Sequence, residues 1–150
     1  MPDTDDMPRP APDQPAEALT ARDWSEGVDV RDRSSMRAGI SNAMVGLKKE
    51  FYGKGPDRVK TFFNDNYVFC VLEGGLTRNE KTLIDNGEAE LVRQYRLRFQ
   101  SAMSKPTMGA VAQVTGREVL NYHSQIVLNP TFTFEIFVLD APVGTDDQAA

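Results

Sequence analysis

Residues 119–139 read VLNYHSQIVLNPTFTFEIFVL, and this stretch decides the fold. Apolar residues recur at alternate positions on both sides of Asn129-Pro130, a dipeptide that marks turns. A period of two is typical of a half-buried β-strand, because successive side chains point to opposite faces of a sheet. The stretch therefore predicts a β-hairpin.

A second hairpin is predicted earlier in the chain. Residues 59–63 and 67–72 are rich in β-branched and aromatic side chains, and Asn64-Asp65-Asn66 lies between them. Asn and Asp tolerate positive φ, so this cluster suits a tight connection between two strands. Two hairpins predict a four-stranded, mainly antiparallel sheet.

Two helices are indicated around this hairpin. The first is predicted to follow Ser34 and Ser35, which can cap it, and to end at Gly53. Thr77 and Glu80 have the spacing of a capping box, which predicts a short helix through about residue 84.

A longer helix is expected after Asn86-Gly87, ending at Gly116. We expect Pro106 to kink or restart it, because proline lacks the N–H of a helical hydrogen bond. In its first half, Arg93, Arg96 and Gln100 are expected on the solvent side. The expected buried stripe consists of Leu91, Val92, Tyr95, Phe99, Ala102 and Met103.

These elements predict an α+β two-layer sandwich, of order αββααββ, with the helices covering one face of the sheet. We expect Phe132, Phe134 and Tyr122 to face the helices. The outward residues would then be His123, Gln125, Thr133, Glu135 and Phe137.

The uncovered face of this sheet requires an explanation. Residues 67–72 are apolar on both faces, so their strand favours burial on both sides. A second copy of the chain is the simplest cover, and we expect a homodimer. The alternative is that the chain's own ends fold over the face.

One domain is expected over residues 33–140, between a disordered acidic, proline-rich arm (1–32) and a disordered tail (141–150). The arm holds five prolines, nine acidic residues and three arginines, and it has few apolar side chains to offset the entropy of ordering. A transient helix or docking point around Trp24 is the alternative. As a hypothesis, the acidic arm is attracted to the basic residues of the domain and inhibits the binding of other anions to them.

Composition excludes several classes of protein. One cysteine (Cys70) and one histidine (His123) cannot make a disulfide framework or a cysteine-rich zinc site. With no signal peptide and no run of about 18 apolar residues, we expect a cytoplasmic protein without direct membrane insertion. We also expect no metal, cofactor or catalytic residue, because no nucleotide fingerprint or catalytic triad is present and Cys70 lies in an apolar strand.

Basic residues concentrate between residues 48 and 60 and again on the long helix. They would suit an anionic ligand, nucleic acid or acidic lipid head groups, and a solvated surface is the alternative. The segment Gly53-Lys54-Gly55-Pro56 lacks the spacing of a phosphate loop and follows a helix, so a helix-ending turn is favoured. The candidate binding residues are Lys54, Arg58, Lys60, Arg93, Arg96, His123 and Ser124.

Several short motifs together resemble a known family. They are KEFYGKGP (residues 49–56) with Val59-Lys60, Leu76-Thr77 with Glu80-Lys81, Val92-Arg93 with Arg96, Thr115-Gly116, His123-Ser124 with Ile126, and residues 134–140. With these motifs, residues 36–139 resemble the MpsC family, named for a component of a sodium-translocating, membrane-potential-generating system. The resemblance implies a soluble bacterial protein with no assigned catalytic residues. It also implies contact with a membrane partner.

Three functions follow, in order of preference. We expect a non-enzymatic accessory or regulatory protein that acts through its sheet face and basic edge. A small-ligand or nucleic-acid-binding regulatory domain is the alternative, although the order of elements differs from the common RNA-binding pattern. The third is an enzyme that uses His123, with Glu135 as its neighbour across the last hairpin.

Overall fold

The computed structural model describes residues 22–143, and residues 1–21 and 144–150 lie outside the described part. Most of the expected arm and tail fall there, so their disorder stays a prediction. The elements are α2 (Arg33–Tyr52), β1 (Arg58–Asn64), β2 (Tyr67–Glu73), α3 (Arg78–Asp85), α4 (Ala89–Thr115), β3 (Val119–Val127) and β4 (Phe132–Leu139). This order confirms the predicted α+β class.

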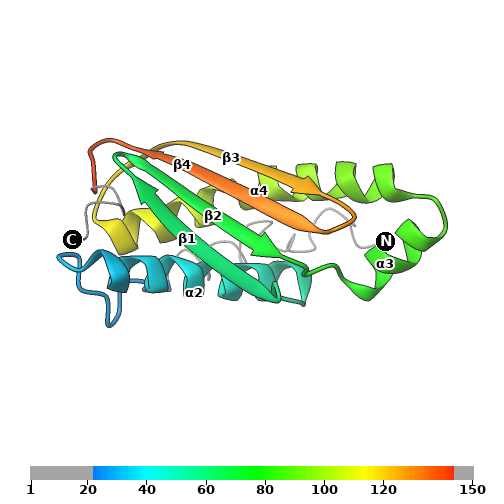
Figure 1. Cartoon of the computed structure of the whole chain (residues 1–150), viewed down its shortest axis with the longest axis horizontal. Helices are drawn as coiled ribbons and strands as arrows, with labels where there is room; N and C mark the ends of the chain where they lie inside the picture. Colours follow the sequence, from blue (N-terminus) through cyan, green and yellow to red (C-terminus); the bar gives the residue numbers. More distant parts are fainter. Residues whose placement is uncertain (1–21, 144–150) are drawn as a thin grey trace, which may run out of the picture.

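The four strands form one antiparallel sheet in the order β1-β2-β4-β3 (Figure 1). Both predicted hairpins are present. Each tight connection contains a non-glycine residue with positive φ, Asp65 at 56° and Asn129 at 61°, which Asp and Asn tolerate better than most residues. The apolar strands β2 and β4 lie at the centre, where they are paired on both edges.

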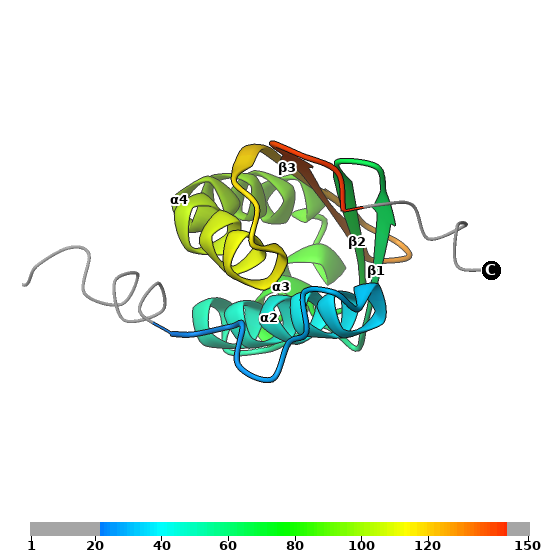
Figure 2. The same ribbon diagram turned by 90° about the vertical axis from the view of Figure 1, so that its left-hand side faces the viewer.

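Helices α2 and α4 lie on the same side of the sheet, as its edge-on view shows (Figure 2). α2 begins two to three residues earlier than expected, because the Asp32 side chain caps it by accepting from the Ser34 N–H at 3.0 Å. It ends at Gly53 as predicted, in the left-handed conformation with φ 78°. The predicted capping box of Thr77 and Glu80 opens α3.

Residues 22–31 lie against the helical layer, which differs from the disorder expected for this part of the arm. Trp24 and Val28 pack against the core. Two glycines of α2 leave room for these side chains. A Cβ at Gly39 would lie 2.8 Å from Val28, and a Cβ at Gly46 would lie 2.6 Å from the Trp24 ring. The prediction of disorder rested on the acidic composition of the arm, which gives no indication of these two apolar contacts.

The expected faces of β4 were wrong. Glu135, Phe137 and Thr133 are buried against the helices, whereas Phe134 is 39% exposed on the other side. Tyr122 does face the helices, as expected, because the strand register places it opposite Phe137. β4 carries apolar side chains on both faces, so alternation alone could not tell the inner face from the outer one.

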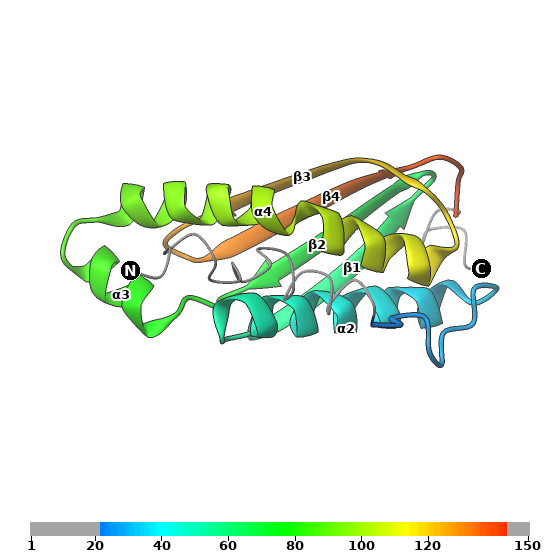
Figure 3. The ribbon, with the colours of Figure 1, turned by 180° about the vertical axis from the view of Figure 1, so that it is seen from behind.

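The expected inner face of α4 was wrong in part, because only Val92, Phe99 and Met103 of the predicted stripe pack into the core. Arg96 and Gln100 are buried, while Leu91 and Tyr95 are exposed. An ion pair in the interior accounts for this reversal and is described below. The helix does not restart at Pro106, and its ribbon changes direction along its length (Figure 3). Within residues 22–143, none of the helices has the length and apolar character needed to cross a membrane.

Candidate functional site

Two charged side chains meet in the interior between the helices and the sheet. Lys48 comes from α2 and Glu135 from the centre of β4, and their Nζ and Oε1 atoms lie 2.8 Å apart. Both side chains are buried, Glu135 completely. Burial of a charge is costly unless the charge is paired, so each of these residues depends on the other.

Tyr122 of β3 joins this pair from the neighbouring strand. Its hydroxyl donates a hydrogen bond to the second carboxylate oxygen of Glu135, and its ring stacks on Phe137 with 4.9 Å between centroids. Burial, followed by the negative charge of Glu135, raises the pKa of Tyr122 far above its ordinary value. The phenol is therefore a permanent neutral donor.

A second buried ion pair joins α4 to α3. The Arg96 guanidinium donates to both carboxylate oxygens of Glu80 and also to the Gly75 carbonyl, the last at 3.0 Å. Glu80 also accepts from the Thr77 N–H in the capping box. Burial acts to raise the pKa of Glu80, but the hydrogen bonds and charge of Arg96 outweigh it, so this pKa lies below its ordinary value.

Tyr52, at the end of α2, lies between the two ion pairs. The Arg96 guanidinium stands 3.9 Å from its ring centroid and the Lys48 ammonium stands 5.6 Å away. Both distances are within the range of cation–π contacts. Burial raises the pKa of Tyr52 against the opposing charge of Arg96. We call Lys48, Tyr52, Glu80, Arg96, Tyr122 and Glu135 the buried polar network.

A groove between α4 and β3 reaches this network from the protein surface. Its volume is about 440 Å³, and Gln100, Tyr122 and Ser124 form part of its lining. The Gln100 Nε2 and Ser124 Oγ atoms are buried and make no hydrogen bond of good geometry. Ser124 is nevertheless close enough to the Tyr122 hydroxyl to act on its pKa, in the lowering direction.

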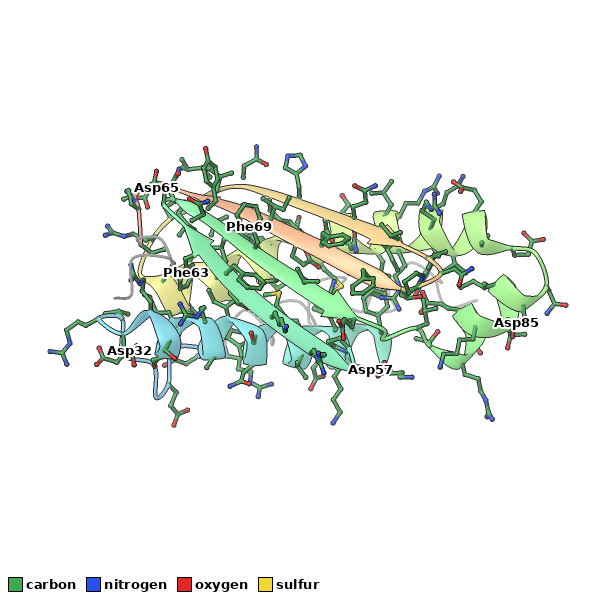
Figure 4. All side chains as sticks on the ribbon, in the orientation of Figure 1. Asp32, Asp57, Phe63, Asp65, Phe69 and Asp85 are labelled. Atoms are coloured by element: carbon green, nitrogen blue, oxygen red, sulfur yellow. The ribbon has the colours of Figure 1, made fainter. Side chains whose placement is uncertain are left out.

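The opposite face of the sheet carries no helix, and we call it the open sheet face. Figure 4 views the molecule from this side, with Phe69 on the surface of β2. A hollow of about 500 Å³ lies over β2, β4 and β3. The exposed or half-buried apolar residues of this face are Phe62, Tyr67, Phe69, Val71, Val127, Phe132, Phe134, Ile136 and Val138.

The predicted basic residues do not form one patch. Arg58 pairs with Glu73 at 3.7 Å, and Arg93 pairs with Glu90 at 3.9 Å on the outer side of α4. Lys60 lies on the exposed side of β1. Two other candidates do come together, because Lys54 and Arg96 line a small cavity of about 10 Å³ beside Gly74 and Gly75.

His123 and Ser124, also predicted to bind, are adjacent in sequence but differ in environment. His123 is exposed and sits opposite Ile136, whereas Ser124 sits opposite Glu135 on the helix-facing side. The third function considered from the sequence uses His123, with Glu135 as its neighbour, but the sheet places these two side chains on opposite faces. Burial raises the pKa of the Cys70 thiol to about 12, which disfavours a thiolate there.

Sequence reasoning missed most of the buried polar network. One signal was available for Lys48, which follows Met44 by four residues and so continues the apolar stripe of α2. Glu135 gave an equivocal signal, because either face of its strand could have been the inner one. Glu80 was recognised as a capping residue, but its partner Arg96 follows 16 positions later and only the tertiary structure joins them.

Comparisons with known proteins place the chain in a family. It is 29% identical over 105 residues to the "Uncharacterized protein YrhF" of Bacillus subtilis (strain 168), across 69% of this chain and 86% of that protein. No solved structure matches it. A family model described as "Na+-translocating membrane potential-generating system (MpsC)" matches residues 32–141, which is more than half of the chain. The chain therefore belongs to the MpsC family, as its sequence motifs predicted, and the family associates it with a Na⁺-translocating, membrane-potential-generating system.

Proposed function

We propose that this chain is a non-enzymatic accessory or regulatory protein of a Na⁺-translocating membrane system, and that it acts as a homodimer on the cytoplasmic side. The observation that carries the proposal is the apolar character of the open sheet face. Monomeric soluble proteins rarely expose a contiguous apolar surface of this kind unless it serves an interaction.

The chemistry of the open sheet face suits a second copy of the same chain. Its two central strands, β2 and β4, carry aromatic and aliphatic side chains outward, with ring pairs such as Phe132 and Phe134 at 6.2 Å. The cation Lys60 and the imidazole His123 lie on the flanking strands. An apolar centre without charges can match itself about a two-fold axis.

The size of the open sheet face is also adequate. Four strands about 4.8 Å apart and about 25 Å long present roughly 500 Å² in projection, and upright side chains increase the accessible area. A standard interface buries about 800 Å² per partner. The face is therefore of the order that a stable dimer needs.

The proposal that the chain performs no chemistry rests on the setting of its reactive side chains. The Cys70 thiol is buried among apolar residues, and its raised pKa opposes nucleophilic use. The two buried carboxylates, Glu80 and Glu135, are each paired with a cation. Each carboxylate is therefore committed to a contact inside the fold.

Substitution of Phe134 by aspartate tests the dimer. The wild-type chain has a protomer mass of 16.7 kDa, and light scattering after size-exclusion chromatography is expected to give twice this mass. The variant is expected to run as a folded monomer, because it places a charge at the apolar centre of the face. Leu91→Asp is the matched control, since Leu91 is exposed on α4 away from the sheet, and it should remain dimeric.

The accessory role has its own test in cells that lack the native protein. Wild-type chain should restore a sodium-dependent membrane potential, measured with a voltage-sensitive dye, and Phe134→Asp should not. A monomeric wild-type protein would refute the homodimer. Full restoration by a monomeric variant would show instead that the open sheet face is dispensable for the role.

A further inference from the structure

The groove between α4 and β3 lies beside the edge of the open sheet face, and its lining shares His123 and Ser124 with the hollow on that face. It is lined by the buried Gln100 at its inner end and by two strongly exposed leucines at its rim, Leu97 (60% exposed) and Leu120 (59% exposed). These are the two most exposed large hydrophobic side chains among residues 22–143. The groove thus combines an apolar entrance with a polar floor.

The polar floor contains hydrogen-bonding groups that are not fully satisfied. Gln100 is 3% exposed and its Nε2 has no hydrogen-bond partner, and the Ser124 hydroxyl makes no hydrogen bond of good geometry. Leaving a buried polar group unsatisfied costs about 1–3 kcal/mol, so native proteins rarely keep one without a reason. Apart from Trp24 Nε1, all buried side-chain atoms without a hydrogen bond in residues 22–143 belong to the network or to this floor.

The charges beneath the floor are already balanced. Lys48 neutralises Glu135, and the Tyr122 hydroxyl is committed to the same carboxylate. A charged ligand would therefore find no counter-charge in the groove lining, apart from the exposed His123 at its edge. A neutral ligand avoids this cost of desolvation.

We propose that the α4–β3 groove binds a small neutral molecule whose head carries both a hydrogen-bond donor and an acceptor, as a carboxamide does. Rotation of the terminal Gln100 torsion presents either its N–H or its oxygen, so the side chain can form a paired hydrogen bond with such a head. The Ser124 hydroxyl supplies a further donor or acceptor. The body of the molecule packs between Leu97 and Leu120.

Benzamide is a suitable probe, with benzoate and toluene as comparisons of the same shape. Titration into ¹⁵N-labelled full-length protein should give saturable shifts of the Gln100 side-chain NH₂ signals, with a Kd on the order of millimolar, as expected for so small a ligand. Benzoate should bind at least about tenfold more weakly because of its charge, and toluene should not move these signals.

Variants of Gln100 distinguish a ligand site from a structural residue. Gln100→Met keeps the volume and removes the hydrogen-bonding head, so benzamide binding should weaken about tenfold, equivalent to one hydrogen bond of about 1.4 kcal/mol. Gln94→Met, on the exposed side of the same helix, is the matched control and should bind as the wild type does. Ser124→Ala provides a second variant with a smaller change, and weaker binding is expected there too.

Several results would overturn the proposal. Equal binding of benzamide and toluene would show an apolar groove without a polar head site. Benzamide binding that survives both Gln100→Met and Ser124→Ala would place the ligand elsewhere. Absence of saturation up to about 10 mM, beyond the affinity expected for a fragment, would show that ordered water suffices for the floor.

Discussion

Lys48 and Glu135 show what single residues contribute to this fold. Each is a charged side chain in a largely apolar interior, and the 2.8 Å contact between them offsets the cost of burying both charges. Loss of one partner leaves an uncompensated buried charge. Lys48→Met and Glu135→Leu are each expected to lower the free energy of unfolding by about 3–5 kcal/mol.

The double variant is the decisive comparison for this pair. Lys48→Met with Glu135→Leu removes both charges, so it should be less destabilised than either single variant, as measured by urea unfolding. Tyr122 would then lose its acceptor, which limits the recovery. Strictly additive losses would contradict the coupling between the two residues.

A second residue-scale prediction concerns acid. The pKa of Glu80 is lower in the folded chain than its ordinary value of 4.5, so its ion pair contributes stability above about pH 4.5 and loses it as the pH falls further. Glu80→Gln should therefore be less stable than wild type at pH 7. The difference should shrink in denaturant titrations below pH 4.5, and a constant difference would contradict the assignment.

At the scale of elements, Gly39 and Gly46 of α2 allow residues 22–31, which precede the helix, to pack closely against it. Gly46 lies in the middle of α2, and Trp24 occupies the space that a side chain there would need. Trp24 is the single tryptophan of the sequence, so its fluorescence reports on this contact alone. The position therefore tests whether residues 22–31 are part of the folded unit.

Gly46→Ala should displace the Trp24 ring and shift its emission to longer wavelength, because a Cβ would lie 2.6 Å from the ring. Gly109→Ala is the matched control in α4, where a Cβ would meet nothing within 4 Å. The control should leave the emission unchanged and stabilise the protein by about 0.5–1 kcal/mol through helix propensity. Unchanged emission in Gly46→Ala would mean that Trp24 does not pack there in solution.

At the scale of the whole molecule, the sheet separates two surfaces. Helices α2 and α4 lie on one side of it and the open sheet face on the other (Figure 2). The α4–β3 groove lies at the β3 edge, and its lining shares His123 and Ser124 with the hollow of the open sheet face. Because Gln100 belongs to α4 and Phe134 to the open sheet face, we expect the two proposed activities to be independent. Phe134→Asp should still bind benzamide with wild-type affinity, and Gln100→Met should keep the mass of the wild type in light scattering.

Local signals in the sequence were enough for the elements and their order. The two hairpins, the left-handed Gly53 and the capping box of Thr77 and Glu80 depend on neighbours within a few positions, and all are present. The family motifs could likewise be recognised in the sequence, and the family model confirms them. Such features need no knowledge of how distant segments meet.

Which side of each element faces inward could be settled only by the folded chain. Arg96 and Glu135 are charged, so hydropathy places them outside, yet each is buried beside a partner from another element. The contacts that permit this burial join residues 16 positions apart in the sequence for Glu80 and Arg96, and 87 positions apart for Lys48 and Glu135. Periodicity along the chain carries no record of such pairs, and for that reason the groove and its floor emerged from the tertiary structure alone.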